Sequence, residues 1–95
     1  MNVIEHMMNL YDESLEELMG AQNYAKKAHK TETSDEKMMY KNMSKQELEH
    51  AHMLMSSGDK LFAGVDASDS LHMVWKSLRG HLYNWKTRIE HMLNT

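Results

Sequence analysis

The stretch KQELEHAHML, residues 45–54, places an acid and an imidazole where a helix would carry apolar side chains. Glu47 and His50 are three residues apart, so a helix puts both on one face. The rest of that face is apolar and comprises Met39, Tyr40, Met43 and Leu54. Because carboxylates are almost never fully buried unless they are paired, Glu47 requires a proton, a basic group or a metal ion as its partner.

A third candidate ligand lies in the preceding helical segment, where Glu17 falls inside the apolar arc. If the two helices fold back on each other at Glu32, the numbers of facing residues add up to about 64, as those of Glu17 and Glu47 do. By the same rule Tyr24 faces Tyr40, roughly 10 Å along the helix axis from the carboxylates. The sequence therefore predicts three converging ligands, which are Glu17, Glu47 and His50.

The neighbouring residues Glu49 and His52 need no such explanation, because they project to the opposite side of the helix, where water can solvate them. The apolar arc of the first segment is wider than a simple hairpin needs. We expect part of that arc to face a second subunit.

A metal ion is the simplest partner for the converging acids. The buried arcs carry no Lys or Arg at that level, and His50 balances at most one negative charge. Carboxylates with one imidazole per ion suit iron, with manganese or zinc as substitutes. Di-iron sites in helical bundles take one Glu from each of two helices and a Glu-x-x-His pair from each of the other two. This chain carries half of that set, so a symmetric dimer would complete it.

The elements that position these residues are predicted to be helices. The chain has no proline and only four glycines, which indicates an all-α fold. Apolar spacing predicts helices over about 2–29, 34–57 and 69–92, the first two joined by a connection short enough to make them an antiparallel hairpin. Thr33 is the predicted N-cap of the second helix, and Gly58 its predicted end.

The composition narrows the classes of function. With 95 residues the chain is one small domain, 1–95, with a core small enough that oligomerisation is expected. A net charge of -3 argues against nucleic acid as a partner, and no apolar run is long enough to cross a membrane. The absence of cysteine excludes disulfides and thiol chemistry, and a cytoplasmic location is the default expectation.

Two motifs together resemble a known family. EELMGAQNYA, followed by ELEH thirty residues after Glu17, resembles the ferritin and rubrerythrin superfamily, in which a first-helix Glu precedes a Tyr by seven residues and the second helix carries Glu-x-x-His. The single copy of the motif and the short third helix resemble most closely the encapsulated ferritins, which are half-length ferritin-like chains. The resemblance covers about residues 5–92.

This resemblance implies a fold and an activity. The fold is a ferritin-like four-helix bundle formed by two chains, with rings of dimers as the larger assembly. The activity is that of a ferroxidase: Fe(II) binds between subunits as a di-iron pair, dioxygen oxidises it, and the ferric product is stored or detoxified inside a separate encapsulin shell. The implied ligands are Glu17, Glu47 and His50, with Tyr24 beside the site and Glu16 on the path by which metal enters.

The sequence departs from the family at two places. Met19 stands where the family has a second acid on the metal path. The chain stops at EHMLNT, without the Leu/Ile-Gly-rich targeting tail of encapsulated members, so the shell is an expectation that the sequence itself does not support.

Two other interpretations stay open from the residues alone. One is a non-catalytic metal-binding or structural helical oligomer. The other is a copper(I) protein built from the eleven methionines, which helix geometry disfavours because Met53 and Met55 project to nearly opposite sides. Adaptable core packing explains the methionines better. The three histidines of the third helix are expected to be solvated; they are His72, His81 and His91.

Overall fold

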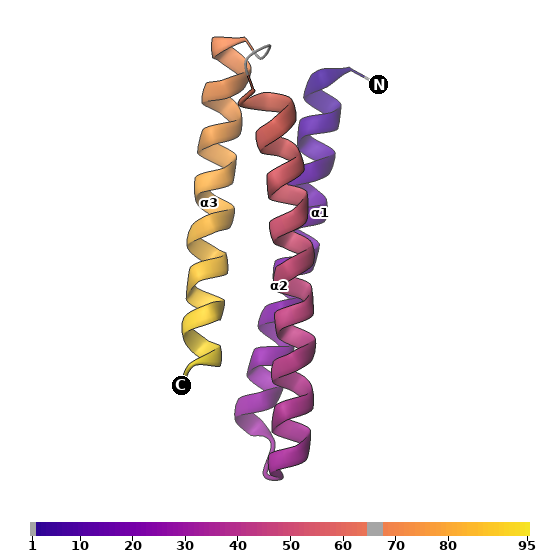
Figure 1. Ribbon diagram of the computed structural model, residues 1–95, viewed down its shortest axis with the longest axis vertical. Helices are drawn as coiled ribbons and strands as arrows, with labels where there is room; N and C mark the ends of the chain where they lie inside the picture. Colours follow the sequence, from indigo (N-terminus) through magenta and orange to yellow (C-terminus); the bar gives the residue numbers. More distant parts are fainter. Residues whose placement is uncertain (1, 65–67) are drawn as a thin grey trace.

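The computed structural model describes residues 2–64 and 68–95, which form three helices and no strand. They are α1 (Val3–Lys30), α2 (Ser34–Phe62) and α3 (Asp69–Leu93). Figure 1 shows α1 and α2 as a long antiparallel pair with α3 alongside. The predicted all-α class and hairpin are confirmed, and the first and third helices lie within one residue of their predicted bounds.

Each helix begins at a residue whose side chain caps it. The side-chain oxygens of Asn2, Thr33 and Ser68 each accept a hydrogen bond from the backbone N–H three residues on, at 2.8, 3.3 and 3.2 Å respectively. Such bonds satisfy amide groups that have no partner within the helix. The predicted cap at Thr33 is confirmed.

The predicted end of the second helix is wrong, because α2 continues through Gly58 to Phe62. Gly58 is buried, and a Cβ atom at this position would overlap the indole ring of Trp75. It therefore serves close packing between helices and does not end one. The predicted connection, 58–68, is correspondingly shorter, and residues 65–67 of it lie outside the described part of the chain.

The buried stripe of α2 lies one residue further on than the pattern of large apolar residues suggests, a rotation of about 100°. Its buried members are Ser44, Leu48, Ala51, Met55, Gly58 and Phe62. The predicted stripe lies on the flank instead, with Met39 and His50 exposed and Glu47 half-buried. The reason is that small residues face α1 and let the two helices of the hairpin pack closely. A prediction from large apolar side chains does not count these small residues as part of the buried stripe.

Small residues line the contact between α1 and α2 on both sides. Ala21, Ala25 and Ala28 of α1 are buried, as are Ser44 and Ala51 of α2. The Ser44 hydroxyl donates a 2.7 Å hydrogen bond to the carbonyl of Ala21, so even this buried polar group is satisfied. The close approach of the backbones determines which flanking side chains can reach across the hairpin.

The third helix covers one side of the hairpin. Near its start, Trp75 and Arg79 both donate hydrogen bonds to Asp59 of α2. Near its end, the imidazole of His29 in α1 contacts the Met92 carbonyl oxygen at 2.9 Å. Figure 1 shows the tip of the hairpin extending past the C-terminal end of α3. In the described residues, no helix combines the length and apolar character required to cross a lipid bilayer.

Candidate metal centre

The structure brings Glu17, Glu47 and His50 together on the flank of the hairpin. Each offers one ligand atom, and these atoms all lie within 4.8 Å of one another. Nδ1 of His50 is 3.4 Å from Oε2 of Glu17. The side chain of Glu17 is 28% exposed and that of His50 is 57% exposed, so the cluster opens at the surface on the imidazole side.

The two carboxyl groups of this cluster oppose each other electrostatically. A hydrogen bond with Glu17, burial and the negative charge of Glu17 together raise the pKa of Glu47, while His50 acts in the opposite direction. The cluster therefore makes the charged form of Glu47 less favourable than it is for a free carboxyl group. A cation bound between the carboxylates would remove the same repulsion.

One oxygen atom of the cluster is buried without a hydrogen bond. Oε2 of Glu17 is buried and accepts no hydrogen bond from any residue that the structure describes. A buried polar group without a partner costs about 1–3 kcal/mol, and more if it is charged. This oxygen, the second carboxylate and the imidazole together form a ligand set that suits a divalent transition metal.

A residue that the sequence did not single out also shapes the cluster. Gly20 lies one turn after Glu17, and a Cβ atom there would be only 3.1 Å from Oε2 of Glu47. The available signal was a glycine in the middle of a strongly helical segment, where alanine is the better helix former.

The predicted supporting residues divide into two groups. Tyr24 faces Tyr40 as predicted, with stacked rings 6.3 Å apart, and the Lys27 ammonium lies 5.6 and 5.7 Å from the two ring centres. Glu16 and Met19 are exposed, and Glu16 also lies outside the group of converging ligands.

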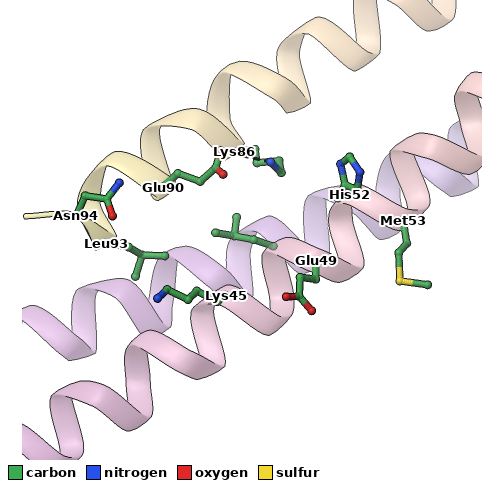
Figure 2. A pocket seen from close by; sticks show the side chains of 9 residues that line it. Lys45, Glu49, His52, Met53, Lys86, Glu90, Leu93 and Asn94 are labelled. Atoms are coloured by element: carbon green, nitrogen blue, oxygen red, sulfur yellow. Dashed lines mark hydrogen bonds and ion pairs between the residues drawn. The ribbon is translucent and has the colours of Figure 1, made fainter.

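The opposite side of α2 carries a second pair with the same spacing, Glu49 and His52. Both are exposed, as predicted. They line a groove between α2 and α3, where Figure 2 shows Glu49 pointing away from α3. Lys86 in this groove forms a 3.3 Å ion pair with Glu90 of its own helix. No opposing carboxylate within the described residues joins Glu49 and His52 in a ligand cluster.

The histidines of α3 are exposed, as predicted. They are His72, His81 and His91. The ring of His81 lies 6.5 Å from that of Tyr11, which indicates packing on α1.

Three ligand atoms from two helices could hold one ion and leave its remaining positions open. Such a half-set suits a metal shared with other ligands or with substrate. Comparison with protein-family models, with curated proteins and with solved structures gives no match for this chain.

Proposed function

We propose that the chain is a ferroxidase of the ferritin-like type, in which two copies bind and oxidise Fe(II) between them. The observation that carries this proposal is the buried Oε2 of Glu17, which accepts no hydrogen bond and lies in a cluster with the Glu47 carboxylate and the His50 imidazole. A bound cation would bind this oxygen and would offset the negative charge of Glu17, which raises the pKa of Glu47 after the hydrogen bond with Glu17 and burial.

The ligand chemistry favours iron among the available metals. Two carboxylates and one imidazole match Fe(II) and Mn(II), and an all-oxygen set would be expected for magnesium. Zinc can occupy the same ligands, but it has no redox chemistry. Fe(II) gives an electron to dioxygen more readily than Mn(II) does, so an oxidase assignment favours iron.

The surface around the cluster supports a second copy of the chain as the partner. Met39 and Leu61, on the same flank of α2, are 47% and 52% exposed. A two-fold axis beside this flank would cover them and would bring a second Glu17, Glu47 and His50 opposite the first. Two Glu residues and two Glu-x-x-His pairs would then enclose two ions. Rings of such dimers, and a surrounding encapsulin shell, stay predictions.

The chain's own residues would have distinct roles in the reaction. Glu17 and Glu47 would bind the substrate ions and offset the charge that rises on oxidation, while His50 would fix the position of one ion. Two ferrous ions would give up one electron each. Dioxygen would take up those electrons with two protons and leave as hydrogen peroxide.

Aerobic addition of Fe(II) tests this proposal. We expect rapid oxidation, followed by the absorbance of ferric iron, with oxygen uptake in fixed proportion to the iron added. A Glu17→Ala variant should oxidise Fe(II) no faster than buffer. Gly80→Ala is a suitable control, because a Cβ at Gly80 meets no atom within 4 Å. Wild-type protein that oxidises iron at the rate of buffer would overturn the proposal.

The raised pKa of Glu47 favours one alternative, a structural oligomer without catalysis. A proton held between Glu17 and Glu47 can satisfy the pair without any metal. In that case the cluster would be a polar network that fixes how two copies associate. This alternative would be identified by Fe(II) binding without oxidation, or by association of two copies that does not depend on metal.

A further inference from the structure

Gly20 lies in the interior of α1, where the backbone gives no reason for a glycine. Its φ is negative, as is that of every other residue described. Glycine is the poorest helix former apart from proline. The reason for a glycine must therefore come from a neighbouring group.

That neighbour is the carboxylate of Glu47. A Cβ atom at Gly20 would lie 3.1 Å from Oε2, 3.4 Å from Cδ and 3.6 Å from Cγ of Glu47. The first two distances are shorter than the roughly 3.5–4.0 Å of an optimal contact between heavy atoms. The Glu47 side chain thus lies against the backbone of α1, so close that a Cβ at position 20 would press on its carboxylate.

We infer that Gly20 is a positioning residue for the metal centre. Its missing side chain lets the Glu47 carboxylate rest against α1, where an oxygen of Glu47 comes within 4.8 Å of the ligand atoms of Glu17 and His50. A methyl group here would push the carboxylate outward from α1 and widen the ligand cluster. This inference rests on the proposed function insofar as the cluster binds metal.

The other glycines provide a matched control. Gly58 is required by the indole of Trp75, far from any ligand of the cluster, whereas a Cβ at Gly80 meets nothing. Gly20→Ala and Gly80→Ala both replace a helical glycine by the best helix former, so their effects on the backbone are alike. A difference between the two variants therefore reports the contact with Glu47.

Anaerobic titration with Co(II), followed by its visible absorption, measures the effect on the site. We expect Gly80→Ala to match wild type and Gly20→Ala to raise the Kd about tenfold or more, as for other residues that orient metal ligands. The absorption spectrum of the bound Co(II) should change as well. In Gly20→Ala with Glu47→Asp, the shorter acid should regain part of the affinity. Equal affinities and spectra for Gly20→Ala and Gly80→Ala would overturn the inference.

A thermal unfolding cycle without metal tests the contact independently of the function. Gly20→Ala should unfold at a lower temperature than Gly80→Ala, and this gap should close when both carry Glu47→Ala. If wild type binds no metal and the gap closes as expected, the proposed function fails and the Gly20–Glu47 contact stands. If there is no gap, or if it persists without Glu47, the inference about Gly20 fails, whatever the protein does with iron.

Discussion

The helix α2 carries two buried or half-buried acids whose surroundings differ sharply. Asp59 receives two hydrogen bonds from Nε of Arg79, at 2.8 and 2.9 Å, and one of 2.8 Å from the Trp75 indole. Glu47, three turns earlier, faces the acid Glu17 and has a raised pKa. Asp59 accepts hydrogen bonds from two donors, whereas Glu47 lies beside a second carboxyl group.

This difference separates an acid that accepts hydrogen bonds from two donors, Asp59, from one that lies against a second acid, Glu47. Asp59 joins α3 to α2 by accepting hydrogen bonds from Trp75 and Arg79, and such bonds are typical of a stabilising polar group. In the Glu17 and Glu47 pair, the buried Oε2 of Glu17 accepts no hydrogen bond from any described residue. A fold retains such an unfavourable arrangement where a ligand or a partner later relieves it.

The largest expected effect is on activity, when one acid of the Glu17 and Glu47 pair is removed. Glu47→Ala should lower the rate of Fe(II) oxidation about a hundredfold or more, since even residues that only orient ligands cost 10–100-fold. The same variant should unfold no earlier than wild type in the absence of metal, because it removes a repulsive pair. Stopped-flow absorbance and thermal unfolding measure the two effects. Wild-type rates in this variant would remove Glu47 from the reaction.

The opposite result is expected for the satisfied acid. Asp59→Ala should lower the free energy of unfolding by about 1–3 kcal/mol, because the Trp75 N–H loses its acceptor in a buried position. Oxidation of Fe(II) per folded molecule should be unchanged. Denaturant unfolding followed by the oxidation assay checks both. A loss of activity that exceeds the loss of folded protein would show that the two acids are not separable.

A smaller effect is expected from pH in the metal-free protein. Because the hydrogen bond with Glu17 and burial raise the pKa of Glu47 above 4.5, folding favours its protonated form. That stabilisation is complete below about pH 4.5 and is lost as the pH rises through the raised pKa. Glu47→Gln, which keeps the hydrogen bond without the charge, should therefore be more stable than wild type at pH 7, by about 1 kcal/mol.

Thermal unfolding of both proteins across this pH range measures the difference. The gap should vanish near pH 4, where wild-type Glu47 is protonated. Saturating Fe(II) under argon should reverse the order at pH 7, since the ion stabilises only the form that binds it. A gap that does not depend on pH would contradict the repulsion between Glu17 and Glu47.

The smallest effect is expected at the stacked tyrosines. Tyr24→Phe keeps the ring on Tyr40 and removes only the hydroxyl group. Its stability should change by less than about 0.5 kcal/mol, as is usual for surface substitutions. The rate of Fe(II) oxidation should stay within about twofold. A much slower rate would make Tyr24 part of the reaction.

The sequence predicted the helices and the facing residues well, because both depend on simple periodicity. The absence of proline indicated the all-α class, and the fold-back at Glu32 placed Glu17 opposite Glu47 and Tyr24 opposite Tyr40. These relations follow from the rise per residue of a helix and from a short turn. They do not depend on how tightly the helices pack.

Features that depend on close packing were beyond the sequence pattern. A glycine that follows a helical pattern, such as Gly58, usually indicates the end of a helix. Here the indole of Trp75 requires this glycine within α2. Ser44 and Ala51 contribute little to an apolar stripe, yet they form the contact with α1. The role of Gly20 depends on where the Glu47 carboxylate lies, which no spacing rule gives.

The most direct test of the central claim is the metal content and molar mass of the protein titrated anaerobically with Fe(II). If the Glu17 and Glu47 carboxylates are offset by iron shared between two copies, binding should saturate at one ion per chain in a dimer or a multiple of a dimer. Glu17→Ala should abolish that binding. A wild-type chain that stays monomeric and binds no iron at these residues would contradict the claim.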